Sequence, residues 1–197
     1  VYLASKLENL GLLSEINLDT DERVFIAPFG MNKIPQYFSR STRVLTNALV
    51  NRISHKKKGW EVFTDAGSFL SSSIVLTMPI AQVEILLRKS ELESFNLPKV
   101  DYLDFHTCTF ISDKHSIGDV ISKNESFPWI CNNSKKGLRN TVDAFTANVN
   151  KNITQRLKDL SNEQKLEIVK GLLNSSGFEN IKGLNVHYWR YAFADNQ

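Results

Sequence analysis

The strongest constraint on the fold is a strict alternation of side chains along residues 102–111. In an extended chain successive side chains point to opposite faces, so even-numbered and odd-numbered residues separate. One face would carry Tyr102, Asp104, His106, Cys108 and Phe110, and the other Leu103, Phe105, Thr107, Thr109 and Ile111. Alternation over this length is typical of a β-strand. The chain is therefore predicted to be built around a sheet.

Further strands and two amphipathic helices are expected in the second half of the chain. Strands are predicted at 127–132, 141–148 and 184–191. Before the last of these, apolar residues recur at helical spacing in two stripes: Val149, Ile153, Leu157 and Leu160, then Leu166, Val169, Leu172 and Leu173. Ser161 and Gln164 have the spacing of a capping box that starts the second helix, which Gly177 ends.

Shorter helices and strands are predicted in the first half of the chain. A helix over 2–10 stops at Gly11, a strand covers 23–27, and Asn32 caps a short helix that runs to about residue 38. Strands at 48–53 and 60–64 flank a hairpin tip at 56–59, and the apolar run 74–78 is expected to form the third strand of this meander, ended by Pro79. Residues 80–88 have helical spacing. The predicted fold class is α+β, a mixed or antiparallel sheet flanked by helices plus a three-stranded meander.

Composition narrows the class of protein. Among 197 residues, 42% are hydrophobic and 23% charged, which is ordinary for a soluble globular protein. No apolar run approaches the ~20 residues needed to cross a bilayer, and the first residues lack a secretory pattern. The two cysteines, Cys108 and Cys131, fit a reducing compartment. We therefore expect a cytoplasmic protein with no membrane partner.

Charge and glycine spacing exclude several functions. The net charge is only +3, and the one dense run, Lys56–Lys58, is interpreted as a solvated hairpin tip, so no nucleic-acid partner is expected. No two of the nine glycines lie closer than six positions apart. This spacing excludes the dinucleotide fingerprint, the phosphate-binding loop and the nucleophile elbow. The four histidines form no helical zinc-protease pair, and no Cys-x-x-Cys occurs.

Three groups of side chains keep alternative interpretations. Asp104, His106 and Cys108 share a strand face, where they would either bind a metal or line the polar side of a sheet; the latter is preferred and no metal is expected. Cys108 and Cys131 would be either buried inert thiols or reactive ones. His187, Trp189 and Tyr191 alternate onto one strand face, while Val186, Tyr188 and Arg190 take the other. Those aromatic rings suit the wall of a pocket, or a sheet face covered by helices.

Four segments together resemble the renalase-like branch of the flavin amine oxidase superfamily. They are Ala27-Pro28-Phe29-Gly30-Met31-Asn32, Val50-Asn51-Arg52-Ile53 with Trp60-Glu61-Val62, Ile74-Val75-Leu76-Thr77-Met78-Pro79, and Trp189-Arg190-Tyr191-Ala192. The resemblance extends from about Phe25 to Tyr191. It implies noncovalently bound FAD and hydride transfer from a small-molecule substrate, a reduced-nicotinamide-like compound or an amine, with oxygen as the usual electron acceptor.

The resemblance also implies a domain organisation and site residues. Residues 1–28 and 80–197 would form the substrate lobe, and residues 29–79 part of the FAD lobe. Cofactor-binding residues would include Val50, whose backbone meets the adenine, together with Gly30, Met31 and Pro79. The substrate pocket would include Trp189, Trp129, His187 and Arg190. Arg190 and the loop Ser134–Arg139 would be weaker candidates for anchoring an anionic substrate, or a solvated basic loop.

The chain departs from the family pattern in two places. It has neither the glycine-rich βαβ unit nor the C-terminal segment that closes over the flavin. Because helix N-termini and close backbone approach bind a pyrophosphate, FAD is expected to bind this chain weakly or not at all, and the missing flavin-binding segments would be its partners. The chain alone is then expected to be inactive. The alternative is a cofactor-free binding or scaffold domain that keeps the sheet.

Overall fold

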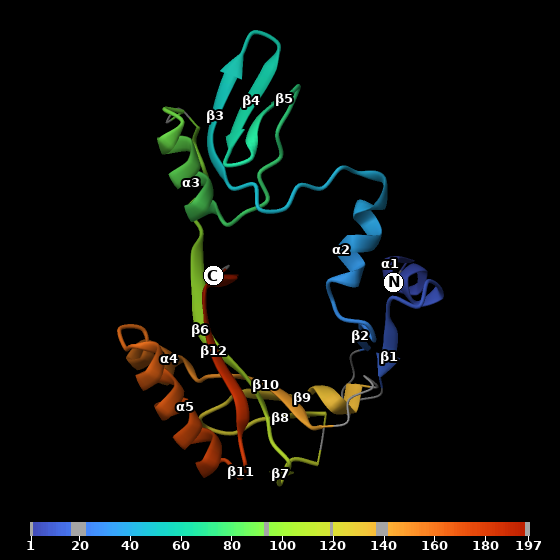
Figure 1. Cartoon of the computed structure of the whole chain (residues 1–197), viewed down its shortest axis with the longest axis vertical. Coiled ribbons are helices and arrows are strands. Elements are labelled where there is room, and N and C mark those ends of the chain that lie inside the picture. Colours follow the sequence, from blue (N-terminus) through green and yellow to red (C-terminus); the bar gives the residue numbers. More distant parts are fainter. Residues whose placement is uncertain (1, 17–22, 93–94, 119, 137–141, 196–197) are drawn as a thin grey trace. The chain divides into compact units, whose positions relative to one another are not determined.

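The structure, a computed structural model, describes residues 2–16, 23–92, 95–118, 120–136 and 142–195 (Figure 1). The chain divides into two compact units. The first comprises residues 1–41 and 103–192, and the second comprises 42–102 and 193–197. The fold class is α+β with antiparallel sheets flanked by helices, as the sequence predicts.

The first unit is organised around a five-stranded sheet in the order β12-β6-β10-β9-β8. The strands are β6 (Asp101–Ile111), β8 (Ile121–Ser122), β9 (Trp129–Asn132), β10 (Ala144–Asn148) and β12 (Lys182–Asp195). Strand β10 pairs antiparallel with both β6 and β9, and β9 pairs antiparallel with β8. All the strands predicted in this half of the chain are confirmed, although β9 and β10 are shorter than the predicted ranges and β12 is longer.

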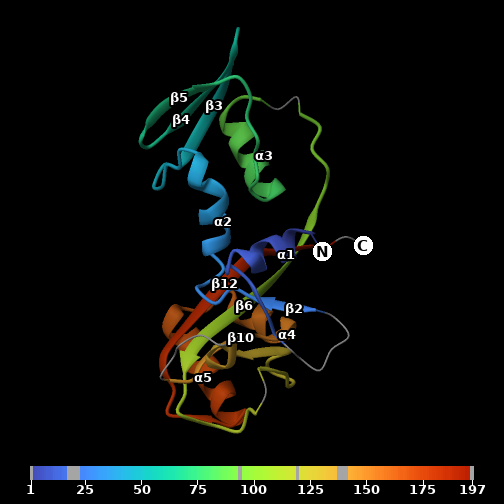
Figure 2. The ribbon, with the colours of Figure 1, turned by 90° about the vertical axis from the view of Figure 1, so that its right-hand side faces the viewer.

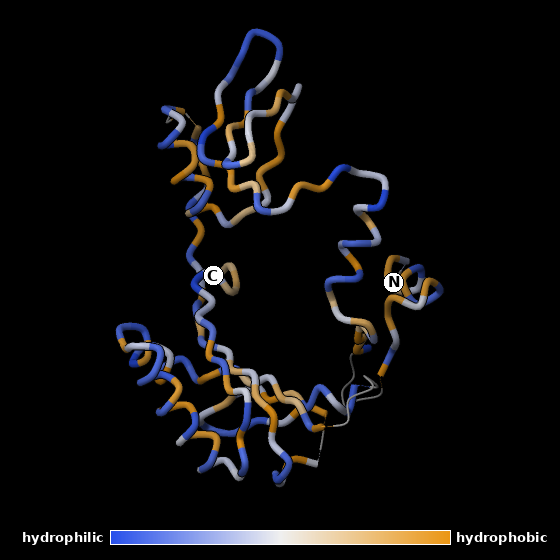
Figure 3. Tube along the Cα trace, in the orientation of Figure 1, coloured by the Kyte–Doolittle hydropathy of each residue, from blue (hydrophilic) through white to orange (hydrophobic). Residues whose placement is uncertain are grey.

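Two helices follow β10 and cover one face of this sheet. Helix α4 (Lys151–Leu157) begins at Asn150, whose side chain accepts a hydrogen bond from Asn152 N. Helix α5 (Asn162–Ser175) begins with the predicted capping box, in which Ser161 Oγ accepts from Gln164 N and Gln164 Oε1 accepts from Ser161 N. It ends before Gly177, which adopts φ +84°. Hydrophobic and hydrophilic residues alternate along both helices in Figure 3.

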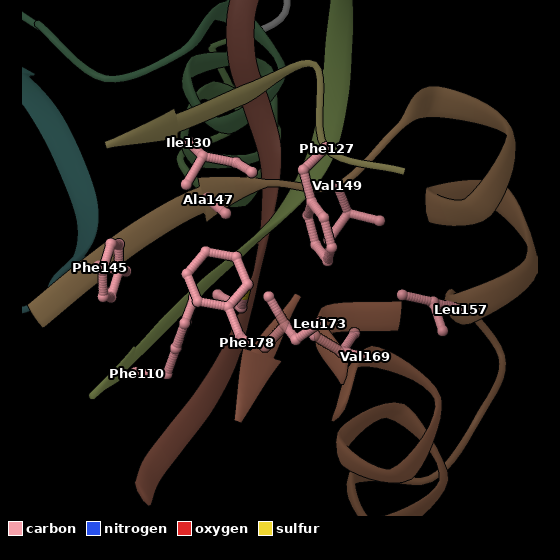
Figure 4. Packing of buried hydrophobic residues seen from close by; sticks show 11 residues of the cluster. Phe110, Phe127, Ile130, Phe145, Ala147, Val149, Leu157, Val169, Leu173 and Phe178 are labelled. Carbon is pink, nitrogen blue, oxygen red and sulfur yellow. The ribbon is translucent and has the colours of Figure 1, made fainter. Parts of the chain in front are cut away.

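The core of the first unit lies between the sheet and these helices. Aromatic rings from three strands meet there: Phe110 lies 5.2 Å from Phe145 and 4.9 Å from Phe178, measured between ring centroids. Figure 4 shows the helical side chains packed against them. The fully buried members of the cluster include Cys108, Phe127, Ile130, Phe145, Ala147, Leu157, Val169, Leu173 and Phe178. Burial of this apolar surface stabilises the unit.

The remaining elements of the first unit are short. They are α1 (Tyr2–Asn9), β1 (Ser14–Ile16), β2 (Val24–Ile26), α2 (Lys33–Phe38), the 3-10 helices Ser39–Ser41 and Asn133–Lys136, β7 (Lys114–His115) and β11 (Phe178–Glu179). Helix α1 ends before Gly11, as predicted. Asn32 precedes α2, as predicted, but its side chain makes no capping hydrogen bond. Strands β1 and β2 pair antiparallel, and β7 pairs with β11.

The second unit is a three-stranded meander with one helix beside it (Figure 2). Its elements are β3 (Val50–Lys56), β4 (Gly59–Thr64), β5 (Gly67–Ser71) and α3 (Ile80–Lys89). The predicted hairpin tip between Lys56 and Gly59 is confirmed. Gly59 is required there, because a Cβ on it would lie 2.3 Å from Ser71 O. Ile53, Val83, Leu86 and Leu87 form the buried core of the unit.

The prediction that residues 74–78 form the third strand of the meander is wrong. The third strand is β5, and residues 74–78 have no strand structure. The turn at Asp65–Gly67 leads directly into β5, which occupies the edge beside β4. Ile74, Leu76 and Met78 pack against the core cluster while Val75 is 85% exposed, so the apolar alternation reflects one-sided packing rather than a hydrogen-bonded ladder.

The unit boundaries lie at residues 41/42 and 102/103, whereas the predicted lobe boundaries lie at 28/29 and 79/80. Helix α3 packs against β3, which brings residues 80–102 into the unit with the meander. The assignment of residues 1–28, 29–79 and 80–197 to substrate and flavin lobes stays a prediction. No helix among the described residues is long and apolar enough to span a membrane.

Candidate functional site

The candidate site lies on the outer face of the five-stranded sheet, defined as the face turned away from α4 and α5. Register and alternation assign its residues. Thr107 and Thr109 of β6 pair with Asn148 and Thr146 of β10. Alternation along the strands places these four side chains on the face opposite to the buried Phe110 and Phe145. Thr107 Oγ1 donates to Asn148 Oδ1 at 2.9 Å. The middle of the outer face thus carries hydroxyl and amide groups, whereas Phe105 and Ile111 of β6 add apolar side chains to the same face.

Trp129 joins this face from β9. It is paired with Asn148 in the sheet, so the two side chains point the same way. Trp129 is partly buried. Cys131 shares the face by its pairing with Thr146, yet it is only 1% exposed. The face therefore carries one large aromatic ring on the β9 side.

Trp189 and His187 join the face from β12. Tyr188, between them, donates a hydrogen bond to Asp104 Oδ2, and its ring lies 4.9 Å from that of the buried His106, so Tyr188 points to the inner face. Alternation then turns His187 and Trp189 outward. Their rings lie 4.6 Å apart at 73°, an edge-to-face contact, and Trp189 is 50% exposed. Three of the four predicted pocket residues therefore share one face: Trp129, Trp189 and His187. Trp129 is separated from the other two by strands β10 and β6, which lie between β9 and β12.

Arg190 is the fourth predicted pocket residue. It lies two residues after Tyr188 on β12, so alternation places it on the inner face with Tyr188. Its side chain is exposed. In the predicted anion-binding loop, Lys135 Nζ donates to Gly118 O and Lys136 Nζ donates to Asn133 Oδ1, so both ammonium groups already have partners. Residues 137–139 of that loop lie outside the described residues.

A polar network on the inner face was not predicted from the sequence. Asp104 forms an ion pair with Lys158 of the segment after α4 and accepts hydrogen bonds from Tyr188 and from Gln155 Nε2. Burial alone would raise the pKa of Asp104, but the hydrogen bonds from Lys158 and Tyr188 outweigh it and lower that pKa. Burial and the bond to Asp104 raise the pKa of Tyr188. Lys158 lies 54 residues after Asp104 in the sequence, so no local sequence pattern predicted this ion pair.

His106 lies beside this network and is 1% exposed. Its backbone N donates to Thr154 Oγ1, but neither ring nitrogen has a hydrogen-bond partner. Burial, reinforced by the positive charge of Lys165, lowers the pKa of His106 to about 4. The sheet thus contains a neutral, desolvated imidazole in contact with the ring of Tyr188.

Asp104, His106 and Cys108 share a face, as the alternation predicts, but it is the buried face. Asp104 is occupied by Lys158 and Tyr188, and the described residues include no group of three His, Cys, Asp or Glu side chains arranged to hold a metal ion. Cys108 is fully buried, and burial raises the pKa of its thiol to about 12. The thiol of Cys108 is therefore un-ionised at neutral pH and a poor nucleophile.

The residues predicted to meet a cofactor fall in both units. In the second unit, a groove of about 320 Å³ is lined by Val50, Ile53, Val62, Leu86 and residues 74–78. Pro79 follows this lining segment and precedes α3. In the first unit, Gly30 adopts φ +94° in the turn before α2, its N donating to Ala27 O, and Met31 is 66% exposed. An apolar groove of this kind has the chemistry to bind a flat aromatic ring.

Comparison with known proteins shows a likeness in fold to a solved structure. No protein-family model and no curated protein matches the sequence. Among solved structures, the fold is similar to the crystal structure of a protein named "Putative protoporphyrinogen oxidase" from Exiguobacterium sp. 255-15, with a TM-score of 0.63 and 16% sequence identity. The match covers 86% of this chain and 41% of that one. This chain therefore shares its fold with about two fifths of that protein.

Proposed function

We propose that this chain is part of an FAD-dependent oxidoreductase of the flavin amine oxidase superfamily, and that the outer face of its sheet forms one wall of the substrate site. The observation that carries the proposal is the likeness in fold, over 86% of the chain, to a protein named as an oxidase. The four sequence segments that resemble renalase-like enzymes support the same superfamily. The domain that the chain contributes is then mainly a substrate lobe.

The chemistry of the outer face supports this role. Trp189 and Trp129 offer large, rigid surfaces with a polar edge, which suit a planar heterocyclic substrate. His187 and the threonine and asparagine side chains supply donors and acceptors that orient such a ring. Hydride transfer requires the donor carbon to be held in a dry, oriented site, and these groups would do that. Arg190 is not part of the proposed pocket, because alternation along β12 places it on the inner face.

The groove at Val50 supports a cofactor-binding role for the second unit. Its lining of aliphatic side chains fits the adenine ring of FAD, and Val50, the residue predicted to meet the adenine, is among them. Bound FAD would supply the hydride acceptor. The widely spaced glycines offer no site for the pyrophosphate, so the proposal assigns that contact to chain segments outside this sequence.

We propose a reduced nicotinamide dinucleotide, or one of its isomers, as the substrate class, with an amine as the second candidate. Both are electron-rich at the carbon that gives up hydride, and a nicotinamide ring matches the aromatic outer face. A cofactor-free scaffold domain is the competing function. It is favoured by the glycine spacing alone.

The test uses protein produced from the complete coding sequence. After desalting, retained visible flavin absorbance and its bleaching by reduced nicotinamide isomers under anaerobic conditions are expected. Bleaching by amines alone would keep the oxidoreductase and replace the substrate class. Absence of retained flavin together with no saturable FAD binding would contradict the proposal and favour the scaffold.

A further inference from the structure

We propose that the groove between α4 and α5 is a binding site for an aliphatic carboxylate, such as a short fatty acid. The groove has a volume of about 240 Å³ and is lined by Ile153, Arg156, Leu157, Ile168, Gly171 and Leu172. It belongs to the helical layer on the side of the sheet opposite the outer face. The site is therefore separate from the proposed redox site.

The lining of the groove is aliphatic. Leu157 at its base is fully buried, whereas Ile168 is 38% exposed, so the groove opens from the core toward solvent. Removing an alkyl chain from water against such a surface is favourable in proportion to the area covered. The volume is below the range typical of drug-sized ligands, which limits the occupant to a short alkyl chain.

One cation stands at the groove and is unpaired. Arg156 lies in the last turn of α4, is exposed, and forms no ion pair or hydrogen bond with any described residue. A guanidinium presents a planar fork of donors that matches a carboxylate in two parallel bonds. An aliphatic lining with a free guanidinium selects an aliphatic anion.

Gly171 supplies an independent observation. It lies inside α5, where glycine disfavours the helix, and a Cβ on it would meet no atom within 4 Å. Packing within the chain therefore does not require glycine here. Because glycine has no side chain, the groove stays open at this point. An alkyl chain could therefore lie across the helix there.

The test is a titration of the isotope-labelled chain with sodium octanoate, followed by the methyl NMR signals of Ile153 and Ile168. Saturable shifts of both methyl groups are expected. Gly171→Leu, which fills the groove with a good helix former, should abolish them, and circular dichroism should show that α5 is retained. Arg156→Gln should weaken octanoate binding about fivefold to tenfold, as expected for one lost charge-assisted pair.

Two controls separate the contributions. Lys170→Gln removes an equal charge from the exposed side of α5 and should leave octanoate binding unchanged. Neutral 1-octanol should bind more weakly than octanoate to the unsubstituted chain, and Arg156→Gln should not affect it. Equal affinity for octanoate and octanol would overturn the carboxylate assignment. Shifts that persist in Gly171→Leu, or the absence of saturable shifts, would overturn the site.

Discussion

The two faces of the five-stranded sheet are made by the same strands and have opposite characters. On the inner face, Phe110 and Phe145 meet each other and Phe178 of β11 ring to ring, and all three are at most 3% exposed. On the outer face, Thr109 pairs with Thr146 and Thr107 with Asn148, and Trp189 remains 50% exposed. Moving one residue along a strand changes the face. The inner face therefore carries the stability of the unit, and the outer face is free to carry a ligand.

The largest expected effect tests the inner face. Phe145→Ala should lower the free energy of unfolding by about 3–5 kcal/mol, because it removes a buried ring and leaves a cavity. Thr109→Ala, on the exposed outer face, should cost no more than about 1 kcal/mol. Denaturant unfolding monitored by circular dichroism measures both. Similar losses for the two variants would break the distinction between the faces.

The buried His106 predicts how the inner face responds to acid. Its pKa in the folded chain is about 4, below the ordinary value of 6.5, so between these values the unfolded chain binds a proton that the folded chain does not. The free energy of unfolding should be unaffected by this group above about pH 7 and fall by about 2–3 kcal/mol as the pH drops from 6.5 to 4. His106→Phe keeps a ring beside Tyr188 and should remove this part of the slope. An unchanged slope would contradict the assignment.

The ion pair of Asp104 tests the polar edge of the inner face. Asp104→Asn leaves Lys158 without its counter-ion and weakens the bond from Tyr188, so it should destabilise the chain by about 1–2 kcal/mol at neutral pH. In a double-mutant cycle with Lys158→Met, the two effects should be less than additive. Strict additivity would show that the two side chains do not interact in solution.

The smallest expected effect lies in the helical cover. Gly171→Ala should raise the free energy of unfolding by about 0.5–1 kcal/mol, because alanine favours the helix and its Cβ meets no neighbouring atom. The thermal midpoint of unfolding reports the gain. A lower thermal midpoint would show that a methyl group at this position clashes with neighbouring atoms.

Patterns that depend on local chemistry were read correctly from the sequence. The alternation of residues 102–111 predicted both a strand and the grouping of His106, Cys108 and Phe110 on one face. Ser161 and Gln164 predicted the start of α5, because a capping box is completed within one turn. Parity likewise predicted that His187 and Trp189 share a face.

Features that depend on distant parts of the chain were missed. Residues 74–78 alternate like a strand, but Gly67–Ser71 takes the edge of the meander, and only the tertiary arrangement decides between the two. The same holds for Lys158 with Asp104 and for His115 with Asp143, whose Nε2 and Oδ2 lie 2.9 Å apart. In each case the partner is chosen by how elements pack, which no spacing in the sequence encodes.

The most direct test of the central claim, that the outer face borders the flavin site, is flavin fluorescence in protein produced from the complete coding sequence. A tryptophan close to a flavin ring quenches its emission by electron transfer. Trp189→Phe should therefore raise the emission of bound FAD and slow its reduction by substrate, while leaving the free energy of unfolding within about 1 kcal/mol. Tyr2→Phe, a change at an exposed aromatic ring of α1, should leave flavin emission unaltered. Equal emission and equal reduction rates in Trp189→Phe and the unsubstituted protein would contradict the account.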